Sequence, residues 1–261
     1  MTTSDTVPSG NVAADKGATF GEHSLPSPTL SLKTLLTSIL LSPFIALLWI
    51  VPCLVPKKKD LIVLIPRFGG TMNGNIKYFF LYLVKGHTQD CEPYLLTQRR
   101  ATAFALQQQG LPVLLHPSLR SVVTLLRARS VVVESTDWSR RLKSLLVRRA
   151  TSFQIWHGNG MKQVSLTGKT FLAKLQGSAL QRWTLRWRNI YPTYDVVFFA
   201  SRMQRERRSA SFSMKETVLN GQPRNDVLFG ADFGGDLIGC DLAGTDKIKR
   251  AVAAGKRVVL Y

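Results

Sequence analysis

The sequence has few cysteines and lacks the short motifs that mark several enzyme classes. Its three cysteines, Cys53, Cys91 and Cys240, lie far apart and form no CxxC pair. This pattern indicates neither a disulfide framework nor a zinc site, and it fits a reducing, cytoplasmic setting. There is no GxGxxG fingerprint and no HExxH motif. Residues 168–170 (GKT) have the end of a P-loop, but Gln163 stands where its first glycine is required. We expect no metal and no cofactor.

Acidic residues are also scarce. The 261 residues include 16 Asp and Glu against 35 Lys and Arg, for a net charge of +19. No pair of carboxylates stands out for acid/base work on glycosidic bonds. So basic a chain predicts an anionic partner, which could be a membrane phospholipid surface, a nucleic acid or a phosphate-rich substrate. No recognisable nucleic-acid-binding module is present, so we expect no nucleic acid.

Charge is absent altogether between residues 34 and 56. As one helix this run would span about 34 Å at 1.5 Å per residue, enough for a bilayer core of about 30 Å. Pro43 and Pro52 interrupt the run, Trp49 lies near one end, and lysines 57–59 follow at once. We predict a membrane-spanning or interfacial segment with a basic flank over residues 31–59, and the positive-inside rule places the rest in the cytoplasm. The alternative without a membrane is a buried core helix.

Residues 1–30 are rich in Ser, Thr, Pro, Gly and Ala and show no apolar period. They predict a disordered tail. Beyond the lysines, short apolar runs alternate with helical patterns, which predicts an α/β fold with a parallel sheet and helices on both faces. The predicted strands are 60–65, 94–97, 112–115, 131–134, 152–156, 195–200 and 217–219. The predicted helices are 75–84, 99–109, 119–128, 142–149, 177–191, 202–208 and 247–254.

One stretch, residues 153–162 (FQIWHGNGMK), predicts a strand that ends in a tight turn at a histidine. In open α/β sheets, ligands bind beyond the carboxyl ends of the strands. The glycines after His157 permit close approach of a substrate, and an imidazole suits proton transfer near neutral pH. His157 is therefore the candidate general base. The alternative is a histidine that only caps the turn.

Three blocks carry a resemblance to a known family. The first is Gln154, Trp156, His157, Gly158 and Lys162; the second is residues 195–201, which end in Ser201; the third is Gly221, Pro223, Arg224, Asn225, Asp226 and Leu228. In order and spacing they resemble the CDP-glycerol glycerophosphotransferase family, which polymerises teichoic acids and related capsule polymers. The resemblance covers residues 60–261 and is most specific from residue 154 to residue 228.

The resemblance implies the first, Rossmann-like half of a GT-B fold. It also implies transfer of an alditol phosphate, most simply glycerol phosphate, from a CDP-alditol donor to a lipid-linked acceptor polymer. Together with the uncharged run and its lysines, this predicts a protein at the cytoplasmic face of the cell membrane. His157 would be the catalytic residue, and Gly158, Lys162, Ser201 and Arg224 would contact substrate. For Arg224 and its neighbours, a turn followed by a helix cap is the simpler alternative.

Two departures from the family are visible. Gly160 stands where family members usually have a proline, and the sequence stops where the second half of the fold would begin. We therefore expect an acceptor-side domain over residues 60–240, and a linker with the first strand of a truncated domain over residues 241–261. The alternative to an enzyme is a truncated, non-catalytic membrane-associated module that binds acceptor.

Overall fold

The structure is a computed structural model that describes residues 32–138, 142–158, 178–188, 193–230, 238 and 242–259. The tail predicted over residues 1–30 lies outside the described residues, and so does Lys162.

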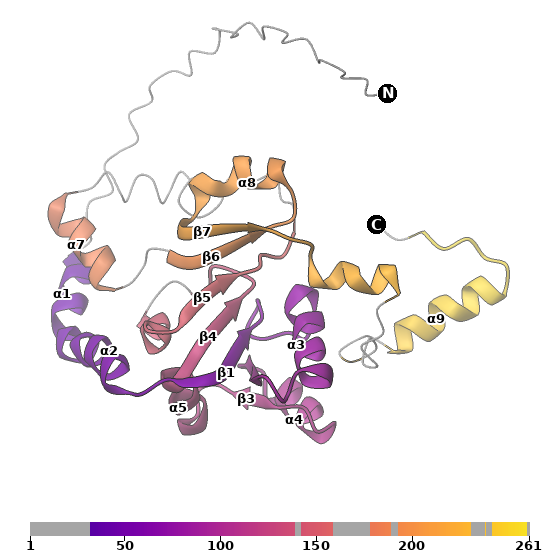
Figure 1. The fold of residues 1–261 in the computed structure, drawn as a ribbon, viewed down its shortest axis with the longest axis horizontal. Helices are drawn as coiled ribbons and strands as arrows, with labels where there is room; N and C mark the ends of the chain where they lie inside the picture. Colours follow the sequence, from indigo (N-terminus) through magenta and orange to yellow (C-terminus); the bar gives the residue numbers. More distant parts are fainter. Residues whose placement is uncertain are drawn as a thin grey trace, which may run out of the picture.

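Seven parallel strands form one sheet, as the alternating pattern predicts (Figure 1). They are β1 (Lys58–Ile65), β2 (Glu92–Thr97), β3 (Val113–Leu115), β4 (Ala128–Val133), β5 (Thr151–Gln154), β6 (Thr193–Phe199) and β7 (Ser213–Leu219). The order across the sheet is β3-β2-β1-β4-β5-β6-β7. The chain runs outward from β1 to β3 and then crosses back to β4, so the direction of winding changes between β1 and β4. Loops diverge at such a switch point and leave room for a ligand.

Helices cover both faces of the sheet because neighbouring residues of the central strands are both apolar (Figure 1). On one face, α3 (Gly74–Gly86) and α4 (Arg100–Gln108) bury Leu64 of β1. On the other face, α5 (Leu119–Arg127) packs Leu125 into the cluster that contains Val63. The remaining helices are η1 (Leu142–Val147), α7 (Ala179–Trp187), α8 (Arg202–Arg208), η3 (Ser209–Ser211), η4 (Pro223–Phe229) and α9 (Leu242–Ala253).

The expectation of one long helix over residues 34–56 is wrong. Two shorter helices, α1 (Leu32–Leu40) and α2 (Ser42–Leu54), take its place. Pro43 lies in the first turn of α2, where its missing N–H is tolerated, so it starts a new helix instead of bending an old one. Within the described residues, no helix combines the length and the hydropathy that crossing a membrane requires.

Three smaller differences concern element bounds. Residues 142–147 form a 3-10 helix where an α-helix is predicted, and β7 begins at Ser213, four residues before its prediction. Residues 256–259 follow α9 without forming a strand. The strand predicted to end at residue 261 lies partly outside the described residues, so the domain boundaries stay a prediction.

Candidate active site

The backbone after β5 is sharply bent, and the bend carries the candidate base. Trp156 has φ of +46°, a left-handed conformation that is a genuine outlier for a bulky side chain. Gly158 has φ of +152°, which only glycine adopts readily. Outliers of this kind persist where the surrounding structure holds them, and they cluster at functional sites. His157 therefore lies in a strained turn at the carboxyl edge of the sheet, as predicted.

Buried side chains hold this turn in place. Gln154 is fully buried; its Oε1 accepts a hydrogen bond from the Trp156 N–H at 2.9 Å, and its Nε2 donates to the Ser135 carbonyl at 3.3 Å. The Trp156 ring packs edge-on against Phe212. The first block of the resemblance thus contains residues that shape the turn as well as the residue it presents.

The His157 ring is stacked on Trp156, with ring centroids 4.4 Å apart, and is half-buried. Burial lowers the pKa of its imidazole below the usual value. Three guanidinium groups, those of Arg67, Arg208 and Arg224, lower this pKa further, while the Asp137 carboxylate opposes them. The ring is therefore neutral at neutral pH and able to accept a proton.

Arg224 comes from the third block and meets the first. Its Nη1 donates a hydrogen bond to the His157 carbonyl oxygen at 3.1 Å. A Cβ on Gly158 would lie 3.4 Å from Arg224 Nη2, so glycine leaves room for the guanidinium group. Arg224 also lies in the first turn of η4, so the turn and helix of the simpler alternative form as well. The structure brings His157, Gly158 and Arg224 together.

Ser201 is placed differently. It is the N-cap of α8, and its Oγ accepts a hydrogen bond from the Gln204 N–H at 3.1 Å. Substrate binding by Ser201 stays a prediction, and so does any role of Lys162. Asp195, at the start of the second block, receives hydrogen bonds from the Ser152 N–H and hydroxyl at 2.7 and 2.9 Å and an ion pair from Lys215 at 2.7 Å. These bonds join β5, β6 and β7 and give Asp195 a structural role.

Two site residues were missed from the sequence. Glu134 follows β4 directly and Asn75 lies in the first turn of α3; both side chains have 0% exposure. The Asn75 side chain donates to the Trp156 carbonyl at 2.6 Å, and its backbone N–H donates to Glu134 Oε1 at 2.8 Å. The available signal was the position of Glu134 immediately after an apolar strand, since polar residues at strand ends collect at one edge.

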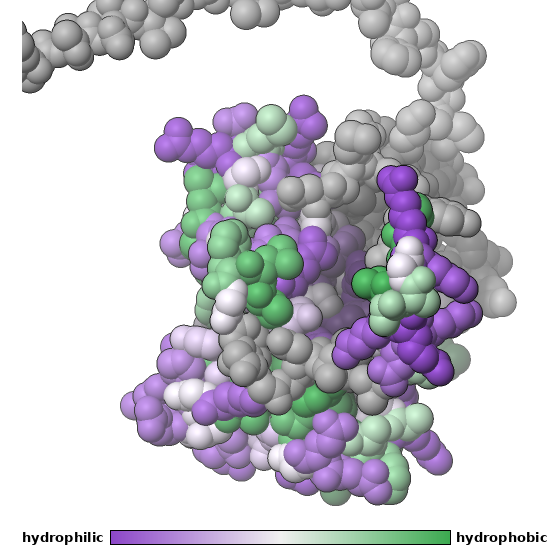
Figure 2. Space-filling view, turned by 90° about the vertical axis from the view of Figure 1, so that its right-hand side faces the viewer, coloured by the Kyte–Doolittle hydropathy of each residue, from purple (hydrophilic) through white to green (hydrophobic). Residues whose placement is uncertain are grey.

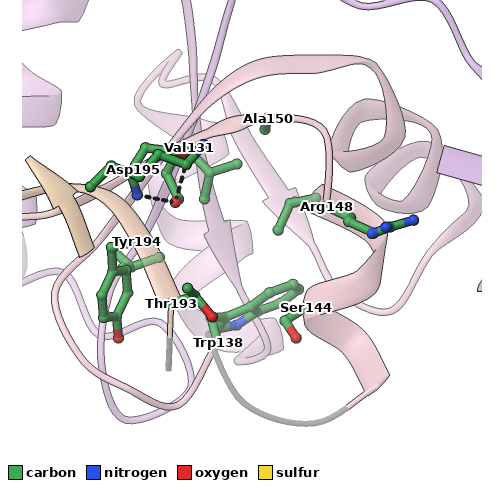
Figure 3. A pocket seen from close by; sticks show the side chains of 12 residues that line it. Val131, Trp138, Ser144, Arg148, Ala150, Thr193, Tyr194 and Asp195 are labelled. Atoms are coloured by element: carbon green, nitrogen blue, oxygen red, sulfur yellow. Dashed lines mark hydrogen bonds and ion pairs between the residues drawn. The ribbon is translucent and has the colours of Figure 1, made fainter. Parts of the chain in front are cut away.

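Two cavities adjoin the sheet. One, of about 410 Å³, lies on the α3 face beside the Gly221–Pro223 turn, and its walls are mostly apolar, including Phe79, Phe153 and Phe198. The second, of about 250 Å³, lies on the opposite face and is lined by Trp138, Tyr194 and the bonded Asp195 carboxylate (Figure 3). Its walls include Ser152 and Thr193, near the amino ends of their strands, and His157 does not line it.

The first cavity suits an apolar group better than a diphosphate. In the described residues, no group of three or more His, Cys, Asp or Glu side chains could hold a metal ion. Figure 2 views the side on which α3 and α9 lie in Figure 1, and it shows hydrophobic and hydrophilic residues intermixed.

The comparisons with known proteins identify the family of the chain. Residues 47–261 match the family described as CDP-glycerol:poly(glycerophosphate) glycerophosphotransferase. The chain belongs to this family. All three blocks of the site lie within the matched residues. A comparison with curated protein sequences gave no match.

Solved structures of the wall teichoic acid polymerase TagF share the fold. A histidine-to-asparagine variant of TagF has a TM-score of 0.50 and 16% identity, covering 76% of this chain and 48% of that one. TagF itself has a TM-score of 0.49 and 18% identity, covering 76% of this chain and 47% of that one. The same variant soaked with CDPG for 15 minutes has a TM-score of 0.49 and 16% identity, covering 75% of this chain and 48% of that one. At such identities the likeness shows the fold alone. The glycerophosphotransferase-family chain described here spans about half the length of the TagF chains.

Proposed function

We propose that this chain forms the acceptor-side half of a transferase that moves glycerol phosphate from CDP-glycerol to a hydroxyl group of a lipid-linked acceptor, in the synthesis of a teichoic-acid-type polymer. Membership of the family supports the donor and the transferred group. The observation that carries the proposal is the neutral His157 ring, presented at the carboxyl edge of β5 with arginines around it.

The reaction forms one bond and breaks one. The acceptor hydroxyl oxygen attacks the phosphorus that carries glycerol, and a new P–O bond forms. The bridging P–O bond to CMP breaks, and CMP leaves with the electron pair. His157 takes the hydroxyl proton as attack proceeds, which is the work of a general base whose neutral form dominates at the working pH.

Positive charge is needed where the phosphates meet the acceptor. Arg67 from the loop after β1 and Arg224 from η4 act on His157 from different elements, together with Arg208 from α8. Such a rim favours an anion, and an arginine fork can hold two phosphate oxygens at once. Gly158 leaves room for the Arg224 guanidinium beside His157, where substrate would approach. We propose that Lys162 and Ser201 extend the same surface.

We further propose that a second Rossmann-like half completes a GT-B enzyme and supplies most of the CDP-glycerol site. The chain covers about half of TagF, which supports this division. The half described here would then bind the acceptor and hold the base.

We also propose that α1, α2 and α7 bind the cytoplasmic surface of the cell membrane. Both helices of the uncharged run expose large apolar side chains: Leu36, Ile39, Leu40, Phe44, Leu47, Ile50 and Leu54. In Figure 1 these helices lie together at one side of the molecule, with α7 against α1 and α2. A helix that lies in the interface uses such a face against the acyl chains.

Aromatic and basic side chains adjoin this apolar face. Trp49 of α2 stacks on Trp187 of α7 with centroids 6.2 Å apart, and its Nε1 donates to the Trp187 carbonyl. The Arg148 guanidinium lies 4.0 Å from the centre of the Trp49 ring, and Trp183 is exposed beside Trp187. Tryptophan and arginine favour the headgroup layer, where anionic lipids attract the basic protein.

The test of the transferase uses an enzyme in which this chain is joined to the proposed second half. His157→Gln keeps hydrogen bonding but removes a base that works at neutral pH. CMP release at saturating CDP-glycerol and acceptor should fall by about 10²–10⁴-fold, with an unchanged circular dichroism spectrum. His87→Gln, at the end of α3, is the matched control and should be as active as the wild type. A His157→Gln enzyme with near-normal turnover would remove His157 from the chemistry.

A further inference from the structure

The proposed reaction does not use Glu134, although its carboxyl group is joined through Asn75 to the loop that carries His157. Glu134 directly follows β4, between the loops that follow β1 and β5, and it has no exposed surface. Burial raises its pKa to about 7, against the lowering effects of the Asn75 amide and of the Arg67 and Arg224 charges. Fully buried glutamates are rare unless paired, so the position calls for a reason.

The amino end of α3 is built around this carboxyl group. Glu134 Oε1 accepts a hydrogen bond from the Asn75 backbone N–H at 2.8 Å. Gly74 has φ of +67°, and a Cβ there would lie 2.2 Å from Oε1. The amino end of a helix favours negative charge, and in nucleotide-binding sheets a phosphate often occupies the position after the first strand. Here Glu134 occupies it, which leaves the arginines as the place for substrate phosphate.

Asn75 connects this carboxyl group to both loops of the site. Its Nδ2 donates to the Trp156 carbonyl at 2.6 Å, and its Oδ1 receives a longer contact of 3.4 Å from the Arg224 N–H. Trp156 precedes the base, and the Arg224 side chain returns to the His157 carbonyl at 3.1 Å. These hydrogen bonds therefore form a network, here called the circuit, that joins Glu134 through Asn75 to the backbone on both sides of His157.

We propose that Glu134 and Asn75 are positioning residues for His157: Glu134 fixes the backbone of Asn75, and the Asn75 side chain holds the His157 and Arg224 loops at one separation. The inference rests on the proposed function for its meaning, but the circuit itself is independent of any reaction. A base held by three loops keeps its alignment to the acceptor hydroxyl, and small displacements of such a group reduce turnover strongly.

The charge of the Glu134 carboxyl group should also affect the His157 ring. Glu134 Oε2 is buried and has no hydrogen-bond partner in the described part of the chain. Gln at this position would make the same Oε1 contact without a charge. Because Glu134 is joined through Asn75 to the Trp156 carbonyl next to His157, a change in the charge of Glu134 should be felt at the His157 ring.

The test follows the histidine rings by NMR in the full chain, which has four histidines. The His157 signal is assigned by its loss in His157→Gln. In the wild type it should show its own titration below pH 6.5 and a second step near pH 7, where Glu134 ionises. Glu134→Gln should abolish the second step, and Asn75→Leu, which has the same branched shape without polar atoms, should displace the His157 signal. His87 and His116 should not change, and Glu216→Gln, at an exposed position on β7, should behave as the wild type.

Activity provides a second readout in the two-domain enzyme. Asn75→Leu should lower kcat by about 10²-fold with little change in the KM for donor, as expected for a displaced catalytic group. A step near pH 7 that persists in Glu134→Gln would show that Glu134 is not coupled to His157, and an unshifted His157 signal in folded Asn75→Leu would overturn the positioning role. If Asn75→Leu does not fold, Glu134→Gln alone decides. The NMR outcomes hold whether or not the enzyme transfers glycerol phosphate.

Discussion

The Arg224 guanidinium donates to the carbonyl oxygen of His157 at 3.1 Å, although the two residues lie 67 positions apart in the chain. One residue comes from the loop after β5 and the other from η4 after β7. This bond joins the first and third blocks of the family resemblance, and it places a positive charge beside the candidate base. The charge has a consequence for the pH dependence of the site.

Arg224→Gln should raise the pKa of His157 toward its usual value. The neutral imidazole is the active form of the base, so a lowered pKa keeps the site active at more acidic pH. With the Arg224 charge gone, the acidic limb of the kcat/KM profile should move to higher pH. Arg202→Gln is the control, because Arg202 is exposed on α8 and does not act on His157. An acidic limb that stays in place, measured by CMP release, would show that the charge of Arg224 does not reach the ring.

Glu134→Gln should change how stability depends on pH. The Glu134 pKa is about 7 in the folded chain and has an ordinary value of 4.5, so between these pH values the folded state binds a proton that the unfolded state has lost. The free energy of unfolding of the wild type should therefore fall, relative to Glu134→Gln, as pH rises from about 4.5 to about 7. At 1.36 kcal/mol per pKa unit, the relative loss is about 3 kcal/mol.

Urea denaturation of both proteins at pH 5 and pH 8 measures this difference. Any constant effect of the amide cancels when the two pH values are compared. A wild type and a Glu134→Gln variant whose stability curves run parallel would mean that Glu134 has an ordinary pKa.

Gly74→Ala should destabilise the fold more than a glycine substitution with the same backbone strain. Gly74 and Gly110 have φ of +67° and +74°, but only the Cβ at position 74 meets an atom, Glu134 Oε1. Gly110→Ala should cost about 1–2 kcal/mol from the left-handed backbone alone. Gly74→Ala should add about 1–3 kcal/mol from overpacking.

The double variant Gly74→Ala with Glu134→Ala separates the contact from the strain. It should recover part of the overpacking cost in a double-mutant cycle from urea midpoints. Additive effects would show that the close approach of Gly74 and Glu134 is absent.

The proposed membrane face should lose binding when it is given negative charge. The variant carrying Leu40→Asp and Leu47→Asp changes two side chains that are 80% and 53% exposed. Burying a leucine contributes about 1.5–3 kcal/mol, so sedimentation with phosphatidylglycerol vesicles should weaken by more than tenfold. The remaining binding should decrease at high salt, because it depends on basic residues.

Phe104→Asp is the control for this experiment and adds one negative charge where the membrane variant adds two. Phe104 is 63% exposed on α4, outside α1, α2 and α7, and its substitution should leave vesicle binding unchanged. A loss in Phe104→Asp in proportion to its single added charge would mean that binding depends on net charge and not on the apolar face.

Much of the fold could be predicted from the sequence because both faces of the central strands are buried. Val63 and Leu64 are both apolar, so the run over residues 60–65 is continuous, and such runs occur mainly in covered parallel sheets. His157 could be placed because a strand pattern stops at a histidine and two glycines. Pro43 was a visible signal for two helices, but the length of the uncharged run outweighed it.

The circuit around His157 could not be predicted in the same way. Asn75 and Glu134 lie 59 residues apart, and nothing local in either segment indicates that they meet. The contact depends on β1 and β4 being neighbours in the sheet, which is a property of the strand order. The sequence shows a glycine at position 74, but it does not show that the Glu134 carboxylate oxygen leaves no room for a Cβ there.

The strand order also determines the stage of translation at which the site can form. Arg224 follows β7, the last strand of this sheet to leave the ribosome, and β7 lies at one border of the sheet. A nascent chain that has reached Gly158 contains Glu134, Asn75 and His157, but not the arginine that closes the far side of the turn. Domains fold as units while they are made, and parallel pairings form late because each requires closure of a long crossover. His157 therefore comes to lie beside Arg224 only after β7 and η4 have been made, and a chain translated only as far as β6 lacks this contact.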